Sequence, residues 1–205
     1  MTAEPGIFEV MYTTRAMRRI KPDPVPEELL LKLVDAANQA ASASNAQRAR
    51  WIVVRDPEQR AHIAELNKAA VLASYGPPDP AADTVEARRR NAFLWQTEHM
   101  AEVPALIFAC LETATPPADT FAAGAASGGS IWPGVQNLLL TARALGLGAV
   151  PTTLVLRDRA ALRAALNLPE TIEPHCMVPV GFPTGTFGPV TRRPVDEIMR
   201  WDRWG

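Results

Sequence analysis

The stretch AASASNAQRARWIVV, residues 40–54, changes character part-way along its length. Its first ten residues are small or polar, with two serines, an asparagine and a glutamine among alanines. The run WIVV at 51–54 is bulky and apolar, which predicts a short buried strand. The polar part has two interpretations, a surface linker or a functional loop, and composition alone does not separate them.

The segments on both sides of this stretch have the spacing of helices. Upstream, residues 27–40 carry leucines and alanines at helical intervals and glutamates in the first turn, which predicts a helix with one buried face. Downstream, Asp56 stands before Pro57, and this pair predicts a capped helix that begins at the proline. A helix, a strand and a second helix are therefore expected around the opening stretch.

The rest of the chain alternates between helical and extended patterns. Prolines and a glycine predict a break from Lys68 to about Ala82, and the region of about 68–100 is a possible flap over an active site. The later segments predict, in order, a helix at 84–102, a strand at 103–112, a long helix at 135–148, a strand-like run at 149–156, a capped helix at 158–168 and a strand at 174–183. Together they predict one α+β domain over residues 1–205, with more helices than strands.

The composition is that of an ordinary globular protein. Of 205 residues, 47% are hydrophobic, and the formal net charge is −1. This charge provides no field that would attract nucleic acid or an anionic membrane, so neither is expected as a partner. The arginines of EARRRNAF at 86–93 leave an anion- or RNA-binding surface as an alternative, but arginines on a helix are usually solvated.

The two cysteines and the apolar runs indicate the compartment. Cys110 and Cys176 lie in apolar segments without the spacing of a metal site, which predicts buried, reduced thiols. The sequence contains no apolar run of the length of a signal peptide or a membrane span. We therefore expect a soluble, cytoplasmic protein.

Familiar catalytic motifs are absent from the sequence, and arginine is the residue type that stands out. HExxH, GxSxG and GxGxxG patterns do not occur, and the three histidines lack metal-ligand spacing, so no metal is expected. Arginines cluster at 15–19 and again at 192–193. Two such clusters can hold one phosphate together, because guanidinium groups match phosphate oxygens and stay charged. Taken alone, each is also compatible with a solvated surface.

Four blocks of sequence, in order, resemble the flavin-dependent nitroreductase family. They are TTRAMRRIKPDPVPEELLLKLVDAANQAASASNAQRARWIVVRDPEQR (13–60), VPALI (103–107), QNLLLTARALGLGAVPTT (136–153) and VPVGFPTGTFGPVTRRPVDEI (178–198). The resemblance implies a central, mostly antiparallel sheet flanked by helices, and an intertwined homodimer that binds FMN. The tail, residues 194–205, is consistent with such a dimer, because Trp201 and Trp204 are large apolar groups that a monomer would leave exposed. Packing of the tail on the partner subunit and folding back of the tail on its own chain are the two alternatives.

The resemblance also implies roles for individual residues. Those at the positions that contact FMN are Arg15, Ala16, Met17, Arg18, Ser42, Asn45, Gln47, Pro151, Thr152, Thr153, Arg192 and Arg193. The arginines would hold the phosphate, the polar loop at 42–47 would bond the flavin's polar edge, and the threonines would lie near N5, unless they are satisfied groups at a strand end. Tyr75 and Trp95 are candidate substrate contacts, with core packing as the alternative for Trp95. The sequence departs from the family pattern at Thr14, Ala16, Ala41 and residues 48–49. These departures leave the expected fold unchanged but make the assignment of individual flavin contacts less specific.

The activity implied by the resemblance is hydride transfer from NADH or NADPH through flavin N5 to a nitroaromatic or quinone. A flavin cofactor explains why no side-chain acid, base or nucleophile stands out, because the cofactor carries the electrons. Two alternatives stay open. One is reductive dehalogenation, since the deiodinases resemble the same family, and the other is a non-catalytic flavin or ligand carrier.

Overall fold

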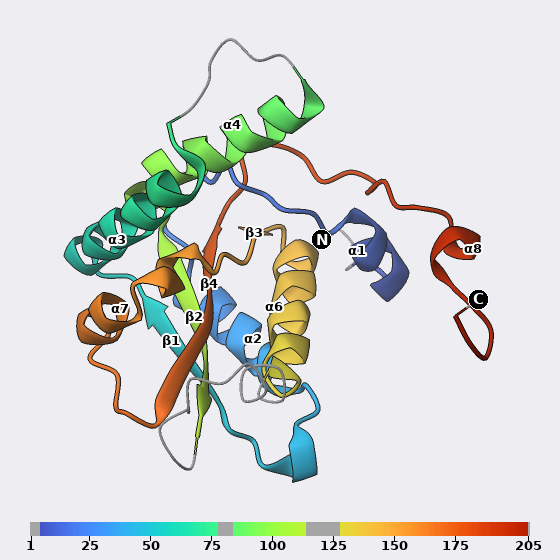
Figure 1. Ribbon diagram of the computed structural model, residues 1–205, viewed down its shortest axis with the longest axis horizontal. Helices are drawn as coiled ribbons and strands as arrows, with labels where there is room; N and C mark the ends of the chain where they lie inside the picture. The colour runs from blue at the N-terminus through green and yellow to red at the C-terminus, as the bar shows by residue number, and fades with distance from the viewer. Residues whose placement is uncertain (1–4, 78–83, 114–127, 205) are drawn as a thin grey trace.

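The computed structural model describes residues 5–77, 84–113 and 128–204. Its centre is a four-stranded antiparallel sheet in the order β1-β2-β4-β3 (Figure 1). The strands are β1 (Ala49–Val54), β2 (Ala105–Glu112), β3 (Gly148–Ala149) and β4 (Ile172–Gly181). The mostly antiparallel sheet expected from the resemblance is thus present, and the opening stretch leads directly into its edge strand β1.

Helices cover both faces of the sheet, and the side chains of β2 explain why. Ile107, Ala109 and Leu111 belong to one apolar cluster, whereas Leu106, Phe108 and Cys110 belong to the other, as the two-residue period of a strand requires. On the first face lie α2 (Glu27–Asn38) and α6 (Trp132–Ala144). The second face is covered by α3 (Pro57–Tyr75), the short helix η3 (Leu154–Arg157) and α7 (Arg159–Ala165) (Figure 1). Helix α4 (Val85–Glu98) packs beside α3 and the short helix η2 (Met100–Glu102).

Several local signals in the sequence are confirmed. The Asp56 carboxylate accepts a hydrogen bond of 2.8 Å from the Gln59 amide, and Pro57 is the first residue of α3. Asp158 caps α7 in the same way, at 2.9 Å from the Ala161 amide. Gly146, which follows α6, has a φ of +75°, a conformation that a residue with a Cβ rarely adopts.

Two predicted elements are wrong in extent. The helix expected to break at Lys68 continues to Tyr75, because the next residues are good helix formers and Gly76, with a φ of +67°, is the first breaker. Residues 78–83 of the predicted flap lie outside the described residues. The strand-like run at 149–156 is mostly not a strand, since Pro151 has no amide hydrogen to pair, and Thr153 takes a helical conformation that starts η3.

Cys110 and Cys176 are buried and unpaired, as predicted. They project from neighbouring strands into opposite apolar clusters. Burial raises the pKa of each thiol to about 12. Neither cysteine therefore forms a reactive thiolate near neutral pH.

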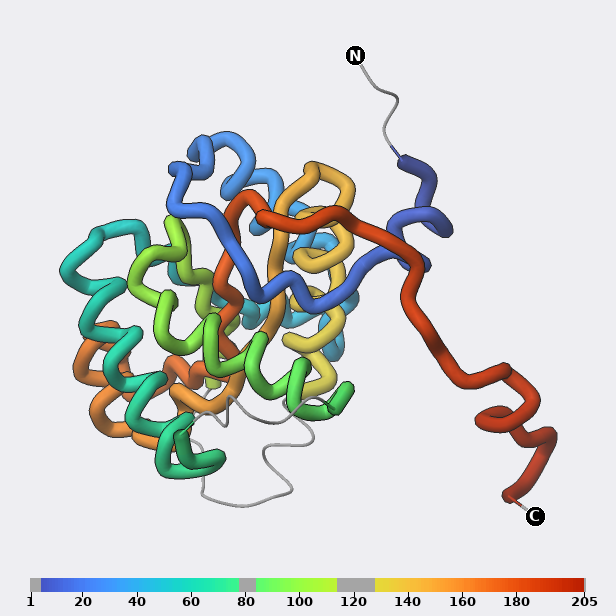
Figure 2. Tube along the Cα trace, turned by 90° about the horizontal axis from the view of Figure 1, so that it is seen from above, coloured from blue at the N-terminus to red at the C-terminus, as the bar shows by residue number. Residues whose placement is uncertain are grey.

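Both ends of the described chain lie outside the three layers. A short helix that the sequence analysis did not predict, α1 (Ile7–Thr13), buries only Val10, and α8 (Val195–Ile198) buries nothing. The C-terminal segment runs away from the body (Figure 2). Large apolar side chains are exposed on these segments: Ile7, Phe8, Met11, Tyr12, Val195, Ile198, Met199, Trp201 and Trp204.

Candidate functional site

A pocket of about 230 Å³ lies between the two chain ends and the middle of α6. It brings together four of the residues predicted to contact a cofactor, which are Arg15, Ala16, Pro151 and Arg192. The other residues that line it are Met11, Thr14, Gln136, Leu139, Ala149 and Val150. Its wall is therefore apolar along residues 149–151, mixed along α6, where Gln136 lies beside Leu139, and cationic at Arg15 and Arg192.

Pairing between the terminal segments brings Arg15 and Arg192 to one place. Backbone hydrogen bonds join Lys21 to Phe182 at 2.8 Å, Thr184 to Arg19 at 3.0 Å and Val190 to Tyr12 at 3.0 Å. Residues 12–21 and 182–190 thus run side by side in opposite directions (Figure 2). Met17 is buried beneath them and its amide bonds Ala149 at 3.5 Å, which fixes the N-terminal segment on β3.

The two pocket arginines, Arg15 and Arg192, are both outside the ion pairs of the described residues. Among those residues, the Arg192 guanidinium donates only to the carbonyl of Thr191, at 2.9 Å. Two guanidinium groups that line one pocket, with no counter-charge from the described part of the chain, make it electropositive. Such a pair suits a phosphate, which accepts charge-assisted hydrogen bonds from several donors at once.

Arg18 and Arg193, the other predicted phosphate ligands, are outside this lining. The Nε of Arg18 is buried without a hydrogen-bond partner in the described part of the chain, and burial lowers the pKa of its guanidinium. Arg193 is exposed. Arg19 is directed elsewhere, with its guanidinium carbon 5.7 Å from the centroid of the Trp95 ring.

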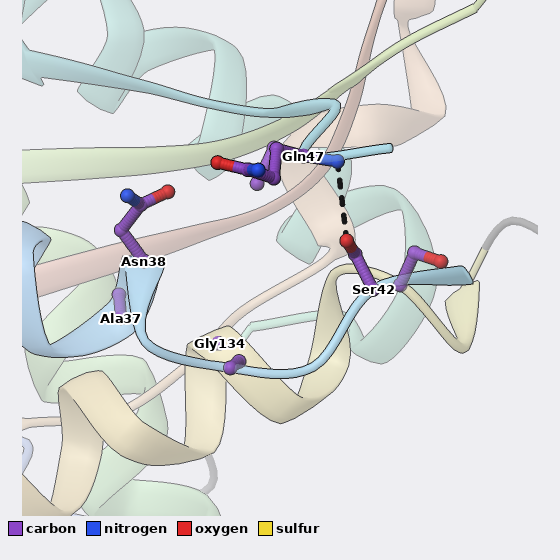
Figure 3. Close-up of a pocket in the computed structure, with 8 residues that line it drawn as sticks. Ala37, Asn38, Ser42, Gln47 and Gly134 are labelled. Atoms are coloured by element: carbon purple, nitrogen blue, oxygen red, sulfur yellow. Dashed lines mark hydrogen bonds between the residues drawn. The ribbon is translucent and has the colours of Figure 1, made fainter. Parts of the chain in front are cut away.

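The polar loop of the opening stretch lies at a different place, beside the N-terminal end of α6. Ser42 and Gln47 line a cavity of about 20 Å³ together with Asn38 and Gly134 (Figure 3), which is room for about one water molecule. The Ser42 hydroxyl accepts a hydrogen bond of 3.1 Å from the Gln47 amide. Within one chain, this loop and the arginine pocket therefore do not form a single site.

Backbone strain distinguishes this loop from an ordinary linker. Ser44, Asn45 and Gln47 all have φ values near +50°, in a region that residues with a Cβ adopt only at a cost. Beyond the bond to Ser42, the Ser130 hydroxyl accepts from the Ala43 amide at 3.3 Å. Strain held in place by specific hydrogen bonds is typical of functional loops, and it favours the second of the two interpretations of residues 40–49.

The residues predicted to lie near flavin N5, Thr152 and Thr153, and those predicted to contact a substrate, Tyr75 and Trp95, are in four different environments. Thr152 uses its amide and carbonyl to pair with Met177, at 2.8 and 2.9 Å, so only its hydroxyl is available to a ligand. Thr153 is exposed and begins η3. Tyr75 is exposed and contacts Phe93 edge-on, with ring centroids 5.5 Å apart. Trp95 is half-buried, stacks on His99 with ring centroids 3.9 Å apart, and does not line the arginine pocket.

Sequence reasoning missed the residues that form the floor of the pocket. Gln136 and Leu139 lie one helical turn apart on α6. The exposed glutamine at the start of an apolar helix was the available signal. Met11 was missed because α1 itself was not predicted, although its apolar residues recur at helical spacing.

Comparison with known proteins decides the family. The model of the "Nitroreductase family" matches residues 12–182. The chain belongs to the nitroreductase family. The resemblance inferred from the four sequence blocks is thus confirmed, and the chain is an oxidoreductase of this family.

Relatives within the nitroreductase family agree with this. An NADH dehydrogenase of Thermus thermophilus is 31% identical over 196 residues, which cover 91% of each protein. An iodotyrosine deiodinase of Thermotoga neapolitana is 25% identical over 198 residues, 94% of this chain and 95% of that protein. The crystal structure of an oxidised iodotyrosine deiodinase bound to FMN and 3-iodo-L-tyrosine has the same fold, with a TM-score of 0.76 at 24% identity over 97% of this chain and 100% of the other.

The described residues contain neither a metal-ligand cluster nor a helix that could span a membrane. No group of three or more His, Cys, Asp or Glu side chains there has an arrangement suited to a metal ion. Within the same ranges, no helix is long and apolar enough to cross a membrane.

Proposed function

We propose that this protein is an FMN-dependent oxidoreductase that takes hydride from NADH or NADPH and passes electrons to a small organic acceptor, such as a nitroaromatic or a quinone. The observation that carries the proposal is the pocket that combines Arg15 and Arg192 with Ala16 and Pro151. The resemblance to the family implies flavin contacts at these four residues, and the pocket lining gathers them from distant parts of the sequence.

The residues present fit the groups of FMN. Arg15 and Arg192 supply charge-assisted donors for a phosphate and are not neutralised by a carboxylate in the described chain. Ala149, Val150 and Pro151 offer an apolar wall for the body of a flavin. When bound, FMN accepts hydride at N5 and passes the electrons on. The hydroxyls of Thr152 and Thr153, which have no hydrogen bond among the described residues, are the candidate donors to that atom.

We propose that a second copy of the chain completes the site. The pocket volume of about 230 Å³ is below the roughly 300–1,000 Å³ that ligand pockets usually have. Ser42, Asn45 and Gln47, which are also predicted flavin contacts, belong to the loop beside the N-terminal end of α6 and are outside the lining of the arginine pocket in the same chain. In a homodimer they reach the pocket of the partner subunit, and the exposed apolar side chains of α1 and the C-terminal segment are covered at the same time.

A second candidate is reductive dehalogenation of a halogenated tyrosine or phenol. The observation that favours it is that an iodotyrosine deiodinase matches 94% of this chain. Both activities would use the same pocket and the same flavin. They differ only in the acceptor, which the identity of the pocket residues does not fix.

Steady-state kinetics test the proposal. Oxidation of NADH and of NADPH is followed with a nitrobenzoate, a quinone and 3-iodo-L-tyrosine in turn. Turnover of the nitro compound or the quinone, with parallel double-reciprocal lines, supports a shared pocket used alternately by donor and acceptor. Turnover of the iodotyrosine alone would assign the dehalogenase activity instead. Bound FMN that is reduced by neither nicotinamide would contradict the proposal and indicate a carrier.

A further inference from the structure

Arg143 joins the two terminal segments to the end of α6. Its Nε donates a hydrogen bond of 2.8 Å to the Thr13 hydroxyl, and its terminal nitrogen lies 3.5 Å from the Glu9 carboxylate. Its guanidinium carbon is 4.5 Å from the centroid of the Phe187 ring. Although it is charged, the side chain is only 15% exposed. One arginine therefore contacts α1 and the C-terminal segment together.

The contacts of Arg143 lie on the same two segments as the pocket arginines, with Thr13 two residues before Arg15 and Phe187 five residues before Arg192. Thr13 is the last residue of α1, and Thr14 and Arg15 follow it into the pocket lining. On the other side, Phe187 is followed by Val190, whose amide bonds Tyr12, and then by Arg192. A shift of Thr13 relative to Arg143 would therefore move Arg15, and a shift of Phe187 would move Arg192.

Within one chain, little else holds α1 in place. Val10 is its only buried residue, while Ile7, Phe8, Met11 and Tyr12 are exposed. The Thr13 hydroxyl is satisfied in both directions, because it donates to the Glu9 carbonyl at 2.6 Å and accepts from Arg143. The arginine also lies in the last turn of α6, where the helix dipole favours a positive charge.

We propose that Arg143 is a positioning residue for the phosphate group, which sets Arg15 and Arg192 at a fixed separation without contacting the ligand itself. This inference rests on the proposed function, since it requires that the two arginines bind FMN through its phosphate. A guanidinium is needed here because its planar fork bonds a hydroxyl and stacks on an aromatic ring at once, which a lysine does not do.

The test is a comparison of FMN with riboflavin, which lacks the phosphate. Both are titrated into the apoprotein of the wild type, Arg143→Met and Thr13→Val, with flavin fluorescence as the readout. We expect Arg143→Met to weaken FMN binding about tenfold, the loss expected for one misplaced charge-assisted contact, and to leave riboflavin binding nearly unchanged. Thr13→Val removes one contact and little volume, so it should cause a smaller loss in the same direction.

A double-mutant cycle and a matched control separate positioning from general stability. In the Arg192→Ala background, Arg143→Met should add less than about a threefold loss, because residues that act through one another are not additive. The control is Arg163→Met. Arg163 is also partly buried and lies in the last turn of a helix, α7, which covers the other face of the sheet, and it bonds the carbonyls of Ile172 and Pro169. The ratio of FMN affinity to riboflavin affinity should therefore stay at the wild-type value in this variant.

Three results would overturn the inference. Equal losses for FMN and riboflavin in Arg143→Met would show that the arginine acts through folding. If the ratio of FMN affinity to riboflavin affinity stays at the wild-type value in both Arg143→Met and Thr13→Val, the pocket does not need these contacts. A wild-type chain that binds FMN no more tightly than riboflavin would instead contradict the phosphate site itself, and the inference with it.

Discussion

Arg15 and Arg192 are the residues on which the account of the site depends. They come from opposite ends of the chain, line one pocket and have no ion-pair partner in the described ranges. Exposed arginines without a partner are common, so the lack of an acid is not decisive alone. What favours a ligand is that both line a concave wall with Pro151 and the small Ala16, where a flavin can approach closely.

Replacement of Arg192 by alanine should weaken FMN binding by about one to two decades. The substitution removes one charge-assisted partner, worth roughly 1.5–3 kcal/mol, and each 1.4 kcal/mol is about tenfold. Riboflavin binding should change little, and Arg89→Ala, on the exposed side of α4, should leave both unchanged. Titration of the apoproteins at fixed ionic strength measures this. Unchanged FMN affinity in Arg192→Ala would mean that the phosphate binds elsewhere.

His175 should make the stability of the fold dependent on pH. Burial lowers the pKa of its imidazole below the ordinary 6.5, with Glu173 opposing and Arg159 adding to the shift. The unfolded chain therefore binds this proton more readily, so stability is lost as the pH falls through 6.5 towards the lowered value. Urea unfolding at about pH 7.5 and about pH 5 should show a smaller loss in His175→Gln than in the wild type. An equal loss would exclude His175 as the cause.

The family pattern selected Arg15, Ala16, Pro151 and Arg192 from distant parts of the sequence, and the structure places these four in the lining of one pocket, because short backbone ladders hold both terminal segments beside β3. Their contact with FMN stays a prediction. Arg18 and Arg193 do not line this pocket. Neighbouring residues in an extended segment point in different directions, and nothing in RAMRR or TRRP tells which arginine faces inward.

Helix α6 is the element that connects the two candidate regions. Gln136 and Leu139 line the arginine pocket, whereas Gly134 lies beside the Ser42 loop and packs against α2. A Cβ at Gly134 would lie 2.9 Å from the Ala37 carbonyl oxygen and 3.1 Å from the Trp51 ring. The glycine therefore permits the close approach of α6 to α2 and β1.

Gly134→Ala should destabilise the protein although alanine is the better helix former. The gain in helix propensity is about 1 kcal/mol, but overpacking against backbone and a ring costs typically about 1–3 kcal/mol and more where neither can move. We expect a lower midpoint in urea unfolding. Gly188→Ala is the control, because a Cβ there would meet nothing within 4 Å. A midpoint for Gly134→Ala at or above that of the wild type would contradict the tight packing.

Elements with strong local signals could be predicted, and those that tertiary contacts define could not. The caps of α3 and α7 and the two-faced apolar strand β2 are visible in the sequence. By contrast, β3 consists of Gly148 and Ala149, too short for any periodicity to reveal. The helix α1 was missed because its seven residues are too few for a helical period to stand out, and Val10 is its one buried residue.

In the molecule as a whole, the apolar side chains of the sheet are buried, whereas those of the terminal segments are largely exposed. Three layers bury both faces of β2 and β4, while Trp201 and Trp204 remain 80% and 84% exposed on the C-terminal segment (Figure 2). Isolated exposed apolar residues need no explanation, but two tryptophans close together do, because such residues are typical of buried interface anchors. The proposed second copy of the chain would cover both tryptophans and would add the Ser42 loop to the pocket.

Replacement of both tryptophans by serine should weaken a homodimer. If each anchors the interface, the dissociation constant should rise by about tenfold or more per tryptophan, and sedimentation velocity across a dilution series measures the change. Leu72→Ser, at a partly exposed apolar residue on the outer side of α3, should have no effect on assembly. A wild-type chain that is monomeric at micromolar concentration and fully active would refute the dimer.

The anaerobic absorption spectrum of the purified protein, recorded before and after addition of NADPH and then of NADH, decides whether this chain is an FMN oxidoreductase. We expect the visible bands of bound FMN in about one equivalent per chain. A reduced nicotinamide should bleach these bands, and a quinone should restore them. A protein that binds no FMN when it is supplied, or whose bound FMN neither nicotinamide bleaches, would contradict the proposed function.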